Sequence, residues 1–301
     1  MRPADRARLS LTGVAVGDAF GETFFTTHEN IERMVSTRTP APGTWRWTDD
    51  TAMATSIVEE LVANGSIDED RLARRFAARY MKEPVRGYGR GAATVLQDIA
   101  AGEPWQRAAT RLFGGTGSFG NGAAMRAAPI GAFFAGELEM VVRQATASAI
   151  VTHSHEEGVA GAIAVALAAA IATTTVGGPF DHRQFFDQIL ALTPPGATRD
   201  GIDAASRLGL ESNVAHAAAT LGNGRRVSAV DTVPFVLWSF ASRPDDLEDA
   251  LWRTATALGD RDTTSAMVGG IGILRNGIDS VPPVWLAAVE PLPSLDVRAP
   301  S

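Results

Sequence analysis

The sequence contains no cysteine and one lysine, Lys82. The absence of cysteine excludes disulfide bonds, thiolate metal sites and a cysteine nucleophile. Positive charge therefore comes almost entirely from arginine, the formal net charge is -7, and no basic tract is present. Stable binding to a nucleic-acid backbone is not expected of such a chain, although a small nucleotide ligand is compatible with it.

Long hydrophobic runs are also missing. Residues 1–6 are mixed in character and do not begin a continuous apolar signal segment. The most apolar stretch, residues 158–172, is shorter and richer in alanine than a membrane span of about 20 residues. We therefore expect a helix buried in a protein core, no membrane partner and a cytoplasmic location.

Convincing period-two strands with hairpin turns are absent, and apolar residues instead recur at helical spacing. After Thr51, for example, Met53, Ile57 and Leu61 fall on one face, and Gly65 is the expected end of that helix. Further helices are expected over residues 69–80, 92–101, 140–152, 203–221, 233–241 and 247–258, where good helix formers dominate. With no repeat and no long linker, the pattern predicts an all-α fold in a single domain over residues 1–301.

Two segments rich in carboxylates and hydroxyls stand at expected helix starts. They are WTDDT, with Thr48, Asp49 and Asp50, and GDRDTT, with Asp260, Asp262 and Thr263. Helix capping explains such residues by itself, because Thr and Asp are favoured N-caps and acids favour the positive end of a helix dipole. The same groups are the oxygen ligands that hard divalent cations require, so both interpretations stay open at this point.

Two other segments have a similar double interpretation. The loop of residues 114–122, GGTGSFGNG, could gather backbone amides around an anion such as a diphosphate, or it could be a flexible surface loop. The pair His153 and His155 in THSHEE suggests metal binding, but a polar helix start explains it more simply. Gly269, Gly270 and Gly272 leave three positions of the following helix without side chains. Such positions allow either the close approach of another group to the helix backbone or close packing against another helix.

Taken in chain order, these segments resemble the ADP-ribosylglycohydrolase family, which includes the dinitrogenase-reductase-activating glycohydrolases. The matching pieces are GVAVGDAFG (residues 13–21), WTDDTAMA (47–54), GSFGNGAAMRAAPIG (117–131), THSHEE (152–157) and GDRDTTSAMVGGIG (259–272). Several motifs in one order over nearly the whole chain are more specific than any single motif. The resemblance implies a compact, orthogonal multi-helix bundle and the removal of ADP-ribose from a modified acceptor.

The resemblance also implies a binuclear Mg²⁺ or Mn²⁺ centre and a substrate site. Thr48, Asp49 and Asp50 would serve one metal, Asp260 and Thr263 the other, and Asp262 would be shared. The residues Gly117, Ser118, Phe119, Gly120 and Asn121 would cradle the ADP-ribose diphosphate and distal ribose, with His153 nearby.

The expected chemistry is hydrolysis of the glycosidic bond. Two cations would bind the ribose hydroxyls, and one would lower the pKa of a water that attacks the anomeric carbon. The catalytic carboxylates Asp49, Asp50 and Asp262 would stabilise the positive charge that develops on the sugar. Glu22 is the candidate general acid or base.

The chain departs from the family pattern in three places. Phe25 stands where members commonly carry a glutamate, and Glu22 lies three residues earlier. Arg261 stands between the two aspartates, where small residues are common, and Arg275 and Asn276 stand where aromatics often contact adenine. These departures motivate the alternative of a non-catalytic ADP-ribose-binding or crystallin-like protein.

A metal-dependent nucleotide phosphohydrolase is a further alternative. The acceptor is left open between arginine, serine, a nucleobase and a small molecule, as is the choice between Mg²⁺ and Mn²⁺.

Overall fold

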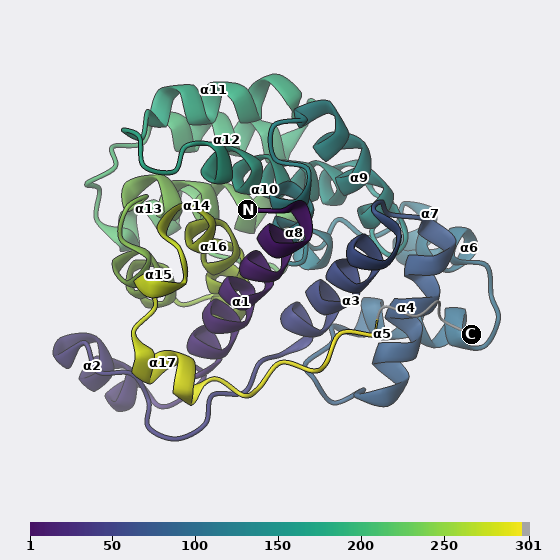
Figure 1. The fold of residues 1–301 in the computed structure, drawn as a ribbon, viewed down its shortest axis with the longest axis horizontal. Helices are drawn as coiled ribbons and strands as arrows, with labels where there is room; N and C mark the ends of the chain where they lie inside the picture. Colours follow the sequence, from purple (N-terminus) through teal and green to yellow (C-terminus); the bar gives the residue numbers. More distant parts are fainter. Residues whose placement is uncertain (297–301) are drawn as a thin grey trace.

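The computed structural model describes residues 1–296 and is built from α-helices and two short 3₁₀ turns (Figure 1). The elements in chain order are α1 (Pro3–Glu22), α2 (His28–Thr37), α3 (Asp49–Asn64), α4 (Glu69–Lys82), α5 (Arg90–Ala100), α6 (Trp105–Thr110), α7 (Leu112–Gly115), η1 (Asn121–Ala123), α8 (Ala128–Phe133), α9 (Leu138–Ile150), α10 (Glu156–Thr174), α11 (His182–Leu192), α12 (Ala197–Arg207), α13 (Val214–Leu221), α14 (Ala229–Ser242), α15 (Leu247–Thr256), α16 (Arg261–Asn276), η2 (Ile278–Ser280) and α17 (Pro283–Ala288). Strand-like pairing over residues 1–296 is limited to two isolated bridges. The prediction of an all-α fold is confirmed, and residues 297–301 of the predicted domain lie outside the described residues.

Most of the helices expected from periodicity are present within a few residues of their predicted ends. The helix that follows the first aspartate pair runs from Asp49 to Asn64 and ends at Gly65, which adopts a left-handed conformation. The prediction of one helix over residues 203–221 was wrong. The chain instead leaves α12 at Leu208, turns, and starts α13 after Asn213, whose side chain accepts a hydrogen bond from the amide of Ala215 at 2.8 Å.

The alanine-rich stretch of residues 158–172 forms most of α10, which lies at the centre of the core. This helix has the length and apolar composition that a membrane span would need, but 78% of its most apolar window is buried inside the fold. It packs against α8, α9, α14 and α16. Its small side chains allow these neighbours to approach closely, as expected of a buried core helix.

The first and last long helices, α1 and α16, lie side by side through a contact lined with glycine (Figure 1). A Cβ at Gly13 would lie 2.3 Å from the carbonyl oxygen of Gly269, and one at Gly17 would lie 2.0 Å from that of Ser265. Gly269 meets Gly13 in the same way from the opposite side. The glycines after the second aspartate motif therefore serve close helix packing, which brings the start of α16 beside the last turns of α1.

Removing the space that Gly17 leaves should destabilise the fold. We predict that Gly17→Ala lowers the free energy of unfolding by about 1–3 kcal/mol or more, because the added methyl group cannot fit against the backbone of α16. Gly178→Ala is the control, since the nearest atom to a Cβ there is 3.9 Å away and the backbone is not left-handed. Denaturant unfolding measures both variants, and equal stability of the two would contradict the packing argument.

Candidate active site

The two aspartate-bearing helix starts meet in space although more than 200 residues separate them in the chain. The hydroxyl of Thr263, at the start of α16, donates to Asp50 Oδ2 at 3.4 Å. The hydroxyl of Thr48, the N-cap of α3, lies 2.9 Å from the same oxygen. Asp50 Oδ1 and Asp262 Oδ1 are buried without a hydrogen-bond partner. The arrangement thus combines the first turns of two helices, of which α3 alone has a side-chain cap, with carboxylate oxygens that have no donor of their own.

Asp18 on α1 also belongs to this cluster and was missed by the sequence reasoning. Its fully buried carboxylate accepts hydrogen bonds from the Thr48 amide (2.9 Å), the Thr48 hydroxyl (2.9 Å), the Thr51 amide (3.1 Å) and the Thr51 hydroxyl (2.5 Å). These bonds fix the first turn of α3 and the orientation of Thr48. A lone aspartate inside the apolar, glycine-rich stretch of residues 13–21 was the signal that could have identified it.

The cluster is strongly acidic and poorly solvated. Burial, with the charges of Asp18 and Asp262 added to it, raises the pKa of Asp49 and Asp50 well above the ordinary value. Burial also raises the pKa of Asp18 and Asp262 to about 6, and burial together with the charge of Asp262 raises that of Asp260 to about 7. These carboxylates therefore resist ionisation together unless positive charge is supplied among them.

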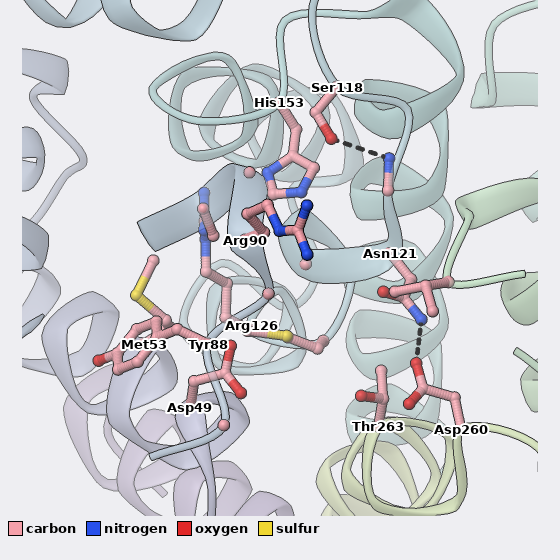
Figure 2. A pocket seen from close by; sticks show the side chains of 18 of the residues that line it. Asp49, Met53, Tyr88, Arg90, Ser118, Asn121, Arg126, His153, Asp260 and Thr263 are labelled. Carbon is pink, nitrogen blue, oxygen red and sulfur yellow. Dashed lines mark hydrogen bonds between the residues drawn. The ribbon is translucent and has the colours of Figure 1, made fainter. Parts of the chain in front are cut away.

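A cavity of about 480 Å³ opens onto this cluster. Asp49 borders it on the side of α3, and Asp260, Asp262 and Thr263 border it on the side of α16. Figure 2 shows Asp49 opposite Thr263 and Asp260 at one end of the cavity, and His153 and Ser118 at the other. Thr48 and Asp50, the neighbours of Asp49 in the chain, do not line it and are buried.

The glycine loop forms one wall of the cavity. Ser118, Phe119, Gly120 and Asn121 line it, and the Ser118 hydroxyl accepts a hydrogen bond from the Gly120 amide at 3.2 Å. The Asn121 amide nitrogen donates to Asp260 Oδ2 at 2.7 Å, as Figure 2 shows, and so links the loop to the acidic cluster. Gly117 does not line the cavity, and a Cβ at this position would lie 2.1 Å from Oγ of Ser154, which does not line it either.

The two histidines of THSHEE have separate positions. His153 is buried and lines the cavity, and burial together with the charge of Arg126 lowers its pKa to about 3. His155 is the N-cap of α10, and its Nδ1 accepts a hydrogen bond from the amide of Glu157 at 3.1 Å. The helix-start interpretation therefore holds for His155, with histidine as the cap, whereas His153 faces the cavity.

Glu22 and two of the departures from the family pattern lie together beside the cavity. Glu22 is about half-buried near Arg261 and does not line the cavity, although its charge contributes to the raised pKa of Asp262. The guanidinium of Arg261 lies 4.3 Å from the centre of the Phe25 ring and donates to the Phe24 carbonyl at 2.7 Å. Phe25, which stands in place of the family glutamate, thus contacts Arg261, which stands between Asp260 and Asp262.

The third departure lies away from the site. Arg275 is at the opposite end of α16, roughly 20 Å along the helix axis from Asp262. It donates to Asp245 at 2.8 Å and to the carbonyl of Gly178 at 2.7 Å, and Asn276 donates to the carbonyl of Pro244 at 2.9 Å. Neither residue lines the cavity, so this departure from the family pattern lies away from the acidic cluster.

The sequence reasoning also missed the segment of residues 87–91, GYGRG, which lines the cavity before and at the start of α5. The hydroxyl of Tyr88 is buried without a hydrogen-bond partner, and burial and the charge of Asp49 raise its pKa. Arg90 is exposed and lines the cavity. A tyrosine and an arginine between glycines, close to a helix start, was the available signal.

No group of three or more acidic or histidine side chains within residues 1–296 is already clustered closely enough to hold one ion. A cation bound here would therefore also draw on the hydroxyls of Thr48 and Thr263 and on small side-chain rotations. The buried, unpartnered oxygens of Asp50 and Asp262 are the atoms that such rotations would present.

Comparison with known proteins gives consistent matches over the full chain. The sequence model of the ADP-ribosylglycohydrolase family matches residues 1–299. The ADP-ribosylhydrolase ARH3 of Homo sapiens is 32% identical, over 100% of this chain and 93% of the relative. The ADP-ribosyl-[dinitrogen reductase] glycohydrolase of Rhodospirillum rubrum is 26% identical, over 98% and 93% of the two chains. A solved ADP-ribosylglycohydrolase-related protein complex has the same fold, with a TM-score of 0.69, 24% identity and coverage of 96% and 93%.

The acidic cluster predicts how stability depends on pH when divalent cations are removed. The folded-state pKa of Asp260, about 7, lies above its ordinary value of 3.8, so the folded protein keeps a proton that the unfolded chain releases. The free energy of unfolding should fall as the pH rises through this interval. Thermal unfolding in a chelator measures the profile, and Asp260→Asn should make it less steep there, because Asp18 and Asp262 still titrate in this interval. A difference between the two proteins that is independent of pH would contradict the electrostatic account.

Proposed function

The chain belongs to the ADP-ribosylglycohydrolase family, and from this membership we propose that it uses two divalent cations to hydrolyse the glycosidic bond between ADP-ribose and a modified acceptor. The observation that supports the proposal most strongly is the meeting of the two aspartate motifs at the end of one cavity. The cavity volume, about 480 Å³, suits a small-molecule ligand.

The residues present fit a pair of Mg²⁺ or Mn²⁺ ions. Both ions prefer carboxylate and hydroxyl oxygens, which the Thr-Asp-Asp and Asp-x-Asp-Thr segments supply. Thr48, Asp49 and Asp50 would hold one ion, Asp260 and Thr263 the other, and Asp262 would be shared. The positive charge of the two ions would relieve the repulsion that raises the pKa of the carboxylates. The ions would also give partners to the unpaired oxygens of Asp50 and Asp262.

When bound, the cations supply Lewis acidity, which lowers the pKa of a water and orients the ribose hydroxyls. The protein's own side chains would supply the stabilisation of the transition state. The carboxylates of Asp49 and Asp262, which line the cavity, would place negative charge beside the sugar and so stabilise the oxocarbenium-like transition state, whereas the buried Asp50 would act as a metal ligand. The burial of these groups strengthens that interaction, because little water screens it.

The opposite end of the cavity supplies donors for the diphosphate. The Ser118 hydroxyl, the His153 imidazole and the guanidinium of Arg90 come from three separate segments that line one cavity. Figure 2 shows these three side chains grouped at the end away from Asp260. An ADP-ribose whose distal ribose lies at the aspartates would therefore place its phosphates among hydrogen-bond donors.

A second candidate function is binding of ADP-ribose without hydrolysis, as a crystallin-like member of the family. Phe25 in place of the family glutamate and the position of Glu22 outside the cavity favour it. Incubation with ADP-ribosylated arginine, serine and nucleic acid in Mg²⁺ or Mn²⁺ separates the two, because a binding protein releases no ADP-ribose. Release of AMP in place of ADP-ribose would indicate a phosphohydrolase.

Removing one carboxylate from the second motif should abolish catalysis. Asp260→Asn and Asp262→Asn should each abolish detectable release of ADP-ribose and weaken Mn²⁺ binding, because both remove negative charge and an oxygen ligand from the cluster. Asp187→Asn is the control, since Asp187 is exposed on α11 away from the cavity. Full activity in both cavity variants would overturn the proposed metal site.

Arg90 should contribute to substrate binding and not to the chemical step. Arg90→Ala should raise KM by about 3- to 10-fold with little change in kcat, because a charged hydrogen bond to a phosphate is lost while the acidic cluster is intact. Arg74→Ala, an exposed arginine on α4 outside the cavity, should behave as wild type. An unchanged KM for Arg90→Ala would remove Arg90 from the binding site.

A further inference from the structure

His153 is the last member of a buried series of hydrogen-bonded side chains that begins at the guanidinium of Arg126. Arg126 is fully buried and its Nη2 donates to the hydroxyl oxygen of Thr152 at 2.9 Å. That hydroxyl lies 2.8 Å from Nδ1 of His153. Both Thr152 and His153 are buried, so solvent does not supply alternative partners for the groups between them.

The direction of each hydrogen bond in this chain follows from the number of protons available. A guanidinium can only donate, so the Thr152 oxygen accepts from Arg126. The single proton of the Thr152 hydroxyl is then free to be donated to His153 Nδ1. In the reverse arrangement the hydroxyl would accept two hydrogen bonds, and its own proton would be buried without an acceptor, which costs free energy.

With Nδ1 acting as an acceptor, the ring proton of a neutral His153 is on Nε2. This nitrogen faces the glycine loop, since a Cβ at Gly120 would lie 3.2 Å from it and one at Gly122 would lie 3.0 Å from it. The absence of side chains at both positions gives the imidazole room at the wall of the cavity.

We infer that Arg126 and Thr152 are positioning residues that hold His153 as the neutral, Nε2-protonated tautomer, so that it presents one fixed hydrogen-bond donor to an anionic oxygen of the cavity ligand. The identity of that ligand as ADP-ribose rests on the proposed function. The tautomer rests only on the buried contacts.

The same arrangement keeps the histidine neutral. The guanidinium of Arg126 lies 4.3 Å from the centre of the Phe76 ring and also donates to the Ser148 carbonyl at 2.8 Å, which holds the cation in place. Burial lowers the pKa of Arg126 to about 9, so it is charged at neutral pH, and the charge of Asp49 favours that state. Burial and this neighbouring cation lower the pKa of His153 to about 3. The donor is therefore the same across the range in which free histidine titrates.

The tautomer can be measured without any ligand. In ¹⁵N-histidine-labelled protein, long-range ¹H–¹⁵N correlation spectra distinguish a protonated from an unprotonated ring nitrogen, and His153→Gln assigns the signal among the five histidines. We expect a protonated Nε2 and an unprotonated Nδ1 for His153, unchanged between roughly pH 5 and pH 8. A protonated Nδ1, or titration of the ring in this interval, would overturn the inference.

The role of Thr152 is tested by removing its hydroxyl while keeping its shape. Thr152→Val should change the His153 signals to a different tautomer or a mixture, and should weaken ADP-ribose binding by about 3- to 10-fold in calorimetry. Thr152→Ser should restore both. Thr254→Val is the matched control, because that buried hydroxyl donates to the Ala250 carbonyl at 2.7 Å on α15, away from the cavity.

An unchanged tautomer in Thr152→Val would overturn the assigned role of Thr152, and circular dichroism checks that each variant is folded. If wild-type protein shows the expected tautomer but does not bind ADP-ribose, the proposed function fails and the tautomer assignment stands. If it binds ADP-ribose but His153 has the other tautomer, the tautomer assignment fails and the proposed function stands.

Discussion

Repulsion among buried carboxylates is the constraint on which the rest of the site depends. Asp18, Asp49, Asp50, Asp260 and Asp262 come from α1, from α3 and from the start of α16. Burial raises the pKa of each, and the charges of neighbouring carboxylates add to this for all of them except Asp18. The fold tolerates this because α1 and α16 are held by a contact without intervening side chains, and because Asp18 accepts four hydrogen bonds from Thr48 and Thr51. Ionising all of these carboxylates without a counter-charge costs free energy, and bound cations would supply that counter-charge.

Helical periodicity was sufficient to predict the fold class, because apolar side chains at helical spacing have few other ways to be buried. It was not sufficient for the chain break between α12 and α13, where Ala, Leu and Val continue the apolar pattern on both sides. Gly209 and the capping residue Asn213 interrupt the helix there. The turn and capping residues therefore end one helix and start the next, although the apolar spacing by itself predicts a single helix.

The composition of the site was similarly predictable in part. The aspartate motifs and, apart from Gly117, the loop of residues 117–121 were placed at the cavity by the sequence because oxygen-rich and glycine-rich segments stand out locally. Asp18, Arg126, Tyr88 and Arg90 were missed, since their importance depends on which distant segments they meet. The contact between Phe25 and Arg261 is of the same kind: each was an isolated departure from the family pattern until the structure placed them 4.3 Å apart.

The cavity thus has one end lined by carboxylates and another lined by hydrogen-bond donors, as the proposed ligand, with a ribose at one end and phosphates beyond it, would require. The most direct test of this account is a crystal of the protein grown in Mn²⁺, with anomalous scattering used to locate the ions. The account predicts two manganese peaks between the first turns of α3 and α16, in contact with Asp50 and Asp262. Strong peaks elsewhere, with none between these two helix starts, would contradict it.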